Sequence, residues 1–391
     1  VESSLRALGD LARAHVARWR KQGGGTLIGI TGSAGKTTTR VATAALVESL
    51  FPGQLVATRG NLNNRIGVPM MLFSLDSQHR ACVVELGTSE PGEIAELCRI
   101  AQPNVGILTL IAAAHLDGLG SIEGVEQEKS AIFSSLPAEG FAVGNGDDSR
   151  VTRLLASAPA SQRLSYGRSS EAAVRLLERT PIGMTRSSLV IGHADGRHSA
   201  FETPLVGEAG ALACAGAIAA VEAAFGVQFD GPRLTEAFAK VQLGEGAQRL
   251  VPLELASGLL VIDDTYNANP TSMVASIRAV LEMAKAMSRP LVLVLGEMRE
   301  LGSEAALGHE QVGRAAAESG ARLVVAVGGG EAQRMTAAAQ AAGFQVLYAP
   351  SVEQGLEAVL EAVTASDMVL VKSSRSVGTD RIVAELARRH G

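Results

Sequence analysis

The sequence contains few of the residues that mark several common classes of protein. Aromatic residues make up 3% of the 391 positions and the formal net charge is −5, so neither base-stacking platforms nor a basic nucleic-acid surface is expected. Cysteines are few, odd in number and widely spaced, which indicates buried thiols in a reducing compartment: Cys82, Cys98 and Cys214. No apolar run approaches the roughly 20 residues of a membrane span, and no signal-peptide pattern begins the chain. These absences predict a cytoplasmic protein.

Lysine is also scarce, because most basic residues in this chain are arginines. It occurs at six positions only: Lys21, Lys36, Lys129, Lys240, Lys285 and Lys372. A lysine amine can lose its proton and react, whereas an arginine guanidinium stays protonated. The lysines that lie beside other polar motifs are therefore candidates for chemistry.

A glycine-rich loop at Thr31–Thr39 predicts a phosphate-binding site. It lies between an apolar run and a helical segment, so its backbone N–H groups and the helix N-terminus would bind an anion. Ile30 stands where a full Walker A motif has its first glycine, which leaves a shortened Gly-x-x-Gly-Lys-Thr form. An ordinary strand-to-helix turn is the alternative. The residues expected to bind the nucleotide are Gly32, Ser33, Gly35, Lys36, Thr37 and Thr38.

The length of the chain predicts two domains, each with alternating strands and helices. In the first domain the expected strands are 26–30, 54–58, 81–86, 105–110 and 140–144, and the expected helices are 37–50, 67–74, 91–101 and 122–135. Residues 163–205 indicate an antiparallel excursion, with strands at 187–191 and 198–203, followed by helices at 210–225 and 232–241. In the second domain the expected strands are 259–263, 291–295, 322–327, 345–349 and 367–371.

We therefore expect an α/β fold in three parts. A linker helix at 1–22 precedes a central P-loop-type ATP-binding domain with a mostly parallel sheet at 23–246. A Rossmann-like α/β domain follows at 247–391, after a glycine-bearing link at 244–246. Gly328-Gly329-Gly330 lacks the spacing of a dinucleotide fingerprint and is interpreted as a turn.

Polar residues gather after several of the expected strands of the first domain. Glu85 ends one strand and suits a Mg²⁺-binding carboxylate. His115 follows another strand and is either structural or a ligand, while Lys129 by itself could be a solvated helix lysine. The loop at 58–67 suits either a set of turns or a polar substrate, through Asn61, Asn63 and Asn64.

Two loops of the second domain also follow strands. Asp263–Pro270 combines two acids and two amides and is interpreted as a recognition loop. Lys372–Arg375 ends the last strand and leads into the terminal helix, which favours a site for a carboxylate or phosphate.

Taken together, these segments resemble the Mur ligase family over essentially the whole chain. The resemblance rests on the order of nine motifs: Thr31–Thr39, Gly60–Asn64 with Ile66–Pro69, Glu85–Gly87, Ala114–Gly118, Glu128-Lys129 with Ile132-Phe133, Asn145 with Asp147-Asp148, Asp263–Pro270, Leu295–Met298 with Leu301-Gly302, and Val371-Lys372 with Ser374-Arg375. It implies that the family's N-terminal UDP-sugar-binding domain would precede residue 1, to which residues 1–22 would be the link.

The resemblance implies an ADP-forming amide ligase that works through an acyl phosphate. The implied substrates are ATP, UDP-N-acetylmuramoyl-tripeptide and D-alanyl-D-alanine, with Mg²⁺ as cofactor and a monomer as the expected state. The implied catalytic residues are Lys36, Glu85, His115 and Lys129, and the implied metal ligands are Thr37, Glu85, His115 and Lys129, the last as a carbamate. Further implied nucleotide contacts are Asn145, Arg249, Asp264, Asn267 and Asn269. The implied substrate contacts are Asn61, Asn63, Asn64, Lys372, Ser374 and Arg375.

The sequence departs from the family pattern at a few positions. The unusual residues are Ala34, Glu90, Leu110, Ala131, Ser373 and the segment Gly207-Glu208-Ala209-Gly210. They leave two alternatives open: a family member that joins another carboxylate to another amine, or a nucleotide-binding protein without catalytic activity.

Overall fold

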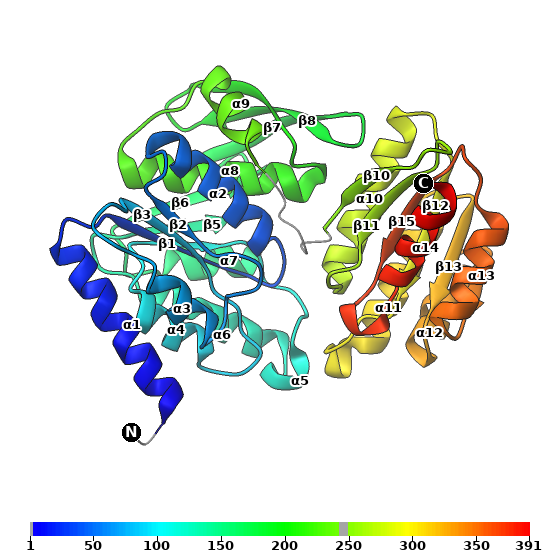
Figure 1. The fold of residues 1–391 in the computed structure, drawn as a ribbon, viewed down its shortest axis with the longest axis horizontal. Coiled ribbons are helices and arrows are strands. Elements are labelled where there is room, and N and C mark those ends of the chain that lie inside the picture. The colour runs from blue at the N-terminus through cyan, green and yellow to red at the C-terminus, as the bar shows by residue number, and fades with distance from the viewer. Residues whose placement is uncertain (1–2, 242–248) are drawn as a thin grey trace. The chain divides into compact units, whose positions relative to one another are not determined.

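The computed structural model describes residues 3–241 and 249–391, which form two compact units. Unit 1 comprises Val1–Thr180, Ser187–Leu205 and Ala209–Gln242, and unit 2 comprises Pro181–Arg186, Val206–Glu208 and Leu243–Gly391. The predicted link at 244–246 lies outside the described residues. Each unit is built around one sheet with helices on both faces (Figure 1).

The sheet of unit 1 has the strand order β2-β3-β1-β4-β5-β6-β7-β8-β9. Its strands are β1 (Thr26–Thr31), β2 (Leu55–Ala57), β3 (Ala81–Glu85), β4 (Val105–Leu108), β5 (Phe141–Asn145), β6 (Gln162–Gly167), β7 (Val174–Ile182), β8 (Arg186–His193) and β9 (His198–Thr203). The first seven strands in this order pair in parallel, and β8 and β9 are antiparallel. The carboxyl ends of β1, β3 and β4 therefore meet at one edge, which is where a parallel sheet binds its ligands.

The helices of unit 1 cover both faces of this sheet. They are α1 (Ser4–Lys21), α2 (Lys36–Leu50), α3 (Gly67–Leu72), α4 (Glu93–Ala101), α5 (Leu116–Leu119), α6 (Ile122–Ser134), α7 (Ser149–Ala156), α8 (Gly207–Phe225) and α9 (Gly231–Ala239). Helices α3, α4 and α6 lie on one face, and α2 and α8 lie on the other (Figure 1). The first face is sealed by apolar side chains such as Leu72, Leu97 and Ile132, which pack on Leu27 and Val84 of the sheet.

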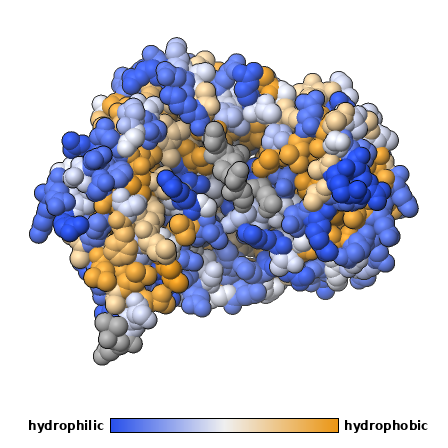
Figure 2. Space-filling view, viewed as in Figure 1, coloured by the Kyte–Doolittle hydropathy of each residue, from blue (hydrophilic) through white to orange (hydrophobic). Residues whose placement is uncertain are grey.

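Helix α1 belongs to this core. Its apolar positions recur at helical spacing, and it buries Ala12, Val16 and Trp19 in the same cluster as α3 and α4. Leu5 and Leu11 stay exposed, and so do Met70 and Phe73 at α3. Figure 2 shows apolar surface close to the N-terminal end of the chain.

Helix α8 corrects the expectation that no segment is long and apolar enough to cross a membrane. Its 19 residues pass that test by length and composition. Its side chains are largely buried, however, including Cys214, Ile218 and Val221, which are fully buried. Burial of this kind is what the central helix of a folded domain shows, so α8 is a core helix of unit 1.

Unit 2 contains a six-stranded sheet with the order β10-β11-β15-β12-β13-β14. Its strands are β10 (Val251–Glu254), β11 (Leu260–Asp264), β12 (Leu291–Gly296), β13 (Leu323–Val327), β14 (Leu347–Ala349) and β15 (Met368–Lys372). Its helices are α10 (Pro270–Ala286), η1 (Gly302–Glu304), α11 (Ala305–Glu318), α12 (Gly330–Ala341), α13 (Val352–Ala362), η2 (Arg375–Val377) and α14 (Asp380–His390). All strands are parallel except β10, which pairs antiparallel with β11.

The alternation of side chains along these strands builds two separate cores. Leu260 and Ile262 face α10 to α12, whereas Val261 faces α13 and α14. A strand that is buried on both faces is a continuous apolar run in the sequence. This is why the five strands expected in the second domain correspond to β11, β12, β13, β14 and β15.

The prediction for residues 163–205 was partly wrong. β8 and β9 form the expected antiparallel pair, but β6 and β7 were not expected. β6 pairs in parallel with β5, and β7 pairs in parallel with β6, so the parallel sheet continues further than the sequence indicated. Helix α7 and strand β10 were also missed. These segments are partly polar and only partly buried, so apolar periodicity carries little signal there.

Candidate active site

The loop after β1 forms a tight cradle held by the end of β4. Gly32 has a φ of +150°, and a Cβ built there would lie 1.8 Å from the Thr109 hydroxyl oxygen, so only glycine fits. The Thr109 hydroxyl donates to the Ala34 carbonyl at 2.6 Å, and the Ser33 amide donates to the Leu110 carbonyl at 2.9 Å. The loop is therefore fixed in a single shape before the start of α2.

Lys36 and Thr37 occupy the first turn of α2. The Lys36 ammonium donates to the Gly32 carbonyl at 2.6 Å, which places its charge over the loop. The N-cap, Gly35, adopts a φ of +82°, a conformation that glycine reaches without strain. Backbone N–H groups at a helix N-terminus beside a lysine suit a bound anion, and nucleotide binding at this loop stays a prediction. The structure gives no reason for the alanine side chain at position 34.

Glu85 lies beside the loop because β3 pairs in parallel with β1, in a register that aligns Ile30 with Glu85. Its carboxylate accepts hydrogen bonds from the Thr37 hydroxyl at 3.0 Å and from the Asn63 side-chain amide at 3.1 Å. The Arg40 Nε lies 3.5 Å from the same carboxylate, whose residue is only 2% exposed. The carboxylate is thus held by two hydrogen-bond donors and one ion pair at the carboxyl edge of the sheet.

Sequence reasoning missed Arg40 and Thr109 at this site. Arg40 follows Thr37 by three residues on α2, so both side chains lie on one face of the helix. That spacing was a usable signal for Arg40. Thr109 carried no signal, because only the pairing of β4 with β1 brings it to the loop.

Lys129 lies inside unit 1 rather than on a solvated helix face. It is 1% exposed, and its Nζ has no hydrogen-bond partner among the described residues. Burial, followed by the positive charge of Lys36, holds the pKa of the Lys129 amine well below its usual value, and the charge of Glu128 opposes this shift. A lowered pKa favours the neutral amine, which is the nucleophilic form, so the site chemically suits carbamylation by CO₂.

The neighbouring carboxylate of Glu128 has a structural role. It accepts hydrogen bonds from the backbone amides of Gly92 and Ile94, at 2.6 and 2.7 Å, and from the Thr88 hydroxyl at 3.1 Å. These amides begin α4, so Glu128 joins α6 to the N-terminus of α4. The pair Glu128-Lys129 therefore combines a helix anchor with a buried amine whose pKa is lowered.

His115 precedes α5 and adopts a left-handed conformation, with a φ of +55°. Its side chain is half-buried. In the two described ranges, no group of three or more His, Cys, Asp and Glu side chains is arranged to hold a metal ion. A metal bound here would thus require other donors, such as the Thr37 hydroxyl or a carbamylated lysine.

The predicted asparagines divide between two kinds of contact. Asn63 holds Glu85, whereas the Asn64 side chain accepts from the amides of Ile66 and Gly67 and so begins α3. Asn61 is exposed. Asn145 accepts from the Asp147 amide at 3.0 Å. Turn chemistry therefore explains Asn64 and Asn145 in this structure, and substrate contacts at these positions remain predictions.

In unit 2 the structure pairs two predicted site residues with each other. The Lys372 ammonium lies 2.8 Å from the Asp264 carboxylate, with both residues buried, and also donates to the Asn267 carbonyl at 3.0 Å. Ser276 donates to the same Asp264 carboxylate. This network fixes the loop that follows β11, with Asn269 capping α10 through the Ser272 amide at 2.8 Å.

Two arginines of the same unit lie against one aromatic ring. The guanidinium carbons of Arg249 and Arg375 lie 4.9 and 5.6 Å from the centre of the Tyr266 ring. The Ser374 hydroxyl accepts from the Arg299 amide at 2.9 Å. The two guanidiniums could bind an anion, whereas Ser374 supports the backbone.

The turn at Gly328-Gly329-Gly330 is indeed not a phosphate cradle. The Glu297 carboxylate accepts from the amides of Glu331 and Ala332, at 3.2 and 3.4 Å, and so occupies the N-terminus of α12. Gly328 has a φ of +136°, and a Cβ there would lie 2.6 Å from Glu297. An internal carboxylate thus replaces the ligand that a dinucleotide fold would bind at this turn.

Two domain families match the chain in sequence: the Mur ligase middle domain at residues 30–221, and the glutamate ligase domain of Mur ligases at residues 248–375. The UDP-N-acetylmuramoyl-tripeptide–D-alanyl-D-alanine ligase of Escherichia coli K12 is 34% identical over 96% of this chain and 80% of that protein. The chain belongs to the Mur ligase family.

Solved structures of Mur ligases have the same fold as this chain. The crystal structure of MurF from Acinetobacter baumannii matches with a TM-score of 0.86 at 29% identity, over 99% of this chain and 81% of that one. MurF from Thermotoga maritima, solved with ADP, matches with a TM-score of 0.84 at 26% identity, over 100% and 84% of the two chains. The predicted family and α/β fold class are confirmed.

Proposed function

We propose that this Mur ligase joins D-alanyl-D-alanine to UDP-N-acetylmuramoyl-tripeptide in peptidoglycan precursor synthesis, with hydrolysis of ATP to ADP and phosphate. The identity to ligases of this specificity over most of the chain supports the assignment. The structural observation that carries it is the arrangement of Thr37, Glu85 and Lys36 around the loop after β1. The proposal places the enzyme in the cytoplasm, acting as a monomer, and makes it necessary for cell-wall growth, cell shape and division.

In the first step, a carboxylate oxygen of the tripeptide attacks the γ-phosphorus of ATP, and the bond to the β-phosphate oxygen breaks. The loop amides and the Lys36 ammonium would hold the phosphates in line with the attacking oxygen. The fixed shape of the loop, maintained by Thr109, means that these donors are oriented before ATP binds.

In the second step, the amine of D-alanyl-D-alanine attacks the acyl carbon. A tetrahedral intermediate forms and then collapses, which releases phosphate and leaves the new amide. We propose that Arg249, Asn267 and Asn269 contact nucleotide, and that Arg375 and Ser374 contact substrate. Because Lys372 and Asp264 neutralise each other in the structure, they would act by fixing the loop that carries Asn267.

The residues at the loop fit Mg²⁺, since a buried carboxylate and a hydroxyl 3.0 Å apart are hard oxygen donors. Thr37 and Glu85 would hold this ion, and a bound Mg²⁺ supplies neutralisation of phosphate charge. A second ion would be held by His115 and by Lys129 in its carbamylated form.

Carbamylation of Lys129 is the part of the proposal that depends most on burial. The unprotonated Nζ attacks the carbon of CO₂: an N–C bond forms, one C=O π bond becomes a C–O⁻ bond, and the nitrogen gives up a proton to water, so that a neutral amine becomes a carbamate anion. The lowered pKa of Lys129 favours the neutral amine that this reaction needs, and its buried Nζ has no hydrogen-bond partner among the described residues. The positive charge of Lys36 acts on Lys129 and would stabilise the negative charge of the carbamate.

The proposal is tested by measuring ADP release with each substrate omitted in turn. We expect release only when ATP, the UDP-linked tripeptide and D-alanyl-D-alanine are all present, and we expect Lys36→Met to abolish it. Release that does not depend on the dipeptide would contradict the assignment of the amine. The unusual segment Gly207–Gly210 favours one further candidate, a ligase for other substrates, which a panel of carboxylates and amines would reveal.

A further inference from the structure

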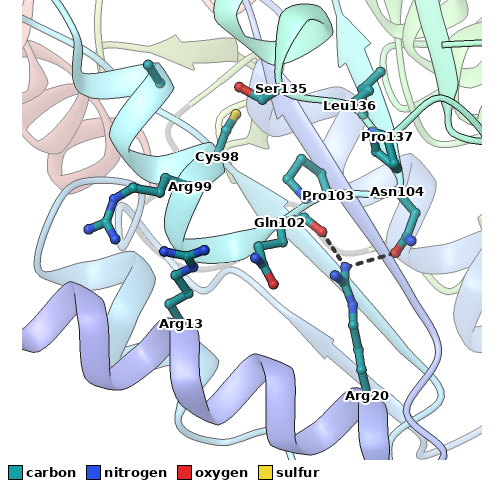
Figure 3. Close-up of a pocket in the computed structure, with 11 residues that line it drawn as sticks. Arg13, Arg20, Cys98, Arg99, Gln102, Pro103, Asn104, Ser135, Leu136 and Pro137 are labelled. Carbon is teal, nitrogen blue, oxygen red and sulfur yellow. Dashed lines mark hydrogen bonds between the residues drawn. The ribbon is translucent and has the colours of Figure 1, made fainter. Parts of the chain in front are cut away.

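A polar cavity lies in unit 1, away from the phosphate-binding loop. It has a volume of about 380 Å³ and lies between α1, the C-terminal end of α4 and the loop that connects α6 to β5 (Figure 3). Asn104 in its wall immediately precedes β4, and Pro137 precedes β5. The cavity is thus at the amino edge of the parallel sheet, whereas the loop that carries Lys36 follows the carboxyl end of β1.

The charged groups that line this cavity are all positive. Arg13 and Arg20 extend from α1, and Arg99 extends from α4 (Figure 3). None of the lining residues is an aspartate or glutamate. Arg99 is paired with Asp10 at 2.7 Å, but Arg13 has no ion pair or hydrogen bond within the described part of the chain. The cavity therefore carries an uncompensated positive charge.

Arg20 supplies the more buried part of that charge. Its Nη2 donates to the Gln102 carbonyl and, at 3.1 Å, to the Asn104 side-chain oxygen. Its Nε is buried and has no partner among the described residues. A buried donor without an acceptor costs free energy, and because this Nε is closed off from solvent, a ligand in the cavity would meet Arg20 through its terminal nitrogens instead.

The remaining polar groups of the wall are neutral. Burial raises the pKa of the Cys98 thiol to about 12, so this group adds no negative charge near pH 7. Ser135 and Gln102 offer uncharged hydrogen-bonding groups from two further segments of the wall. The chemistry of the wall suits oxygen acceptors with negative charge and does not suit a cation.

We propose that this cavity binds a small phosphorylated anion with at least two negative charges. Guanidinium groups pair with phosphate oxygens through parallel hydrogen bonds. The three arginines carry three positive charges, and Asp10 compensates that of Arg99. The two remaining positive charges match a ligand with at least two negative charges. Because the arginines come from α1 and from α4, a bound anion would hold these two helices together. The expected consequence is a stabilisation of unit 1 that depends on ligand concentration.

The test uses pyrophosphate as the probe and isothermal titration calorimetry as the measurement. Pyrophosphate can also occupy the loop after β1, so the titration is carried out on the Lys36→Ala protein and repeated on the Lys36→Ala/Thr37→Ala protein, both without nucleotide or Mg²⁺. Arg13→Glu reverses the charge of an exposed side chain and should not disturb folding. Arg18→Glu is the matched control, because Arg18 is an exposed arginine of the same helix that does not line the cavity.

We expect one saturable site in both preparations, a weakening of at least about tenfold in Arg13→Glu, and little change in Arg18→Glu. Pyrophosphate should also raise the unfolding temperature in the Lys36→Ala protein but not in the Lys36→Ala/Arg13→Glu protein. Absence of saturable binding in both preparations would overturn the proposal. An equal loss in the two charge-reversal variants would also overturn it, since it would show attraction to surface charge in general.

Discussion

The Thr37 hydroxyl donates a 3.0 Å hydrogen bond to the Glu85 carboxylate, which joins the first turn of α2 to the end of β3. The two residues are 48 positions apart in sequence. They meet because β1 and β3 pair in parallel, so the loop after β1 and the last residue of β3 reach the same edge of the sheet.

This contact predicts that Glu85→Gln reduces ligase turnover by about 100-fold or more, since an amide keeps the shape but loses the charge that would hold Mg²⁺. The rate of ADP release is measured over a range of Mg²⁺ concentrations. The unfolding temperature of the same variant reports folding, and turnover near the wild-type rate would show that this carboxylate is not required.

The buried pair Lys372–Asp264 predicts a strong coupling in stability. Lys372→Met leaves a buried carboxylate without its counter-ion and is expected to lower the free energy of unfolding by about 3–5 kcal/mol. The double variant Lys372→Met/Asp264→Leu should recover most of this loss, as measured by urea unfolding. If Lys372→Met unfolds like the wild type and only raises the KM for the amine, the lysine serves the substrate directly.

The anchor formed by Glu128 predicts a loss of stability that is separate from any chemistry at Lys129. Glu128→Gln places an NH₂ group against backbone N–H donors at the start of α4, and we expect unfolding to become easier by about 1–3 kcal/mol. Glu123→Gln on the same helix is the control, because its carboxylate is largely exposed and its ion pair with Arg150 should contribute little. Equal effects in the two variants would contradict the anchoring role.

His309 predicts that unit 2 loses stability in mild acid. Its Nε2 accepts from the Met298 amide at 2.9 Å, the residue is fully buried, and burial lowers the pKa of the imidazole below its usual value. The unfolded chain therefore binds a proton that the folded unit resists. Stability should fall as the pH drops from about 6.5 toward the lowered pKa.

Urea unfolding between pH 7.5 and pH 5 measures this dependence, and His309→Leu is the comparison. The variant is expected to be less stable at pH 7.5, because the Met298 amide loses its acceptor. It should also show a smaller loss of stability toward pH 5. An equal pH dependence in the two proteins would assign the acid sensitivity to other groups.

Local patterns in the sequence were sufficient for much of the fold. Strands such as Leu291–Gly296 are apolar throughout because both of their faces are covered, and glycine and lysine-threonine spacing identified the loop at Thr31–Thr39. The strands β6, β7 and β10 were not predicted. Their residues are only partly buried, and their pairing depends on partners that the chain reaches elsewhere.

The sequence by itself determined which chemical groups this protein has available: a phosphate loop, a carboxylate at a strand end, and a few lysines in an arginine-rich chain. Only the tertiary structure decided which of these groups are buried and which neighbour each one meets. Packing around Lys129 lowers the pKa of its amine, and the pairing of β11 with β15 brings Asp264 to Lys372. The packing of α1 beside α4 brings together the arginines that line the polar cavity. The physical reason is that burial and charge–charge distance depend on contacts between distant segments, which local sequence patterns do not encode.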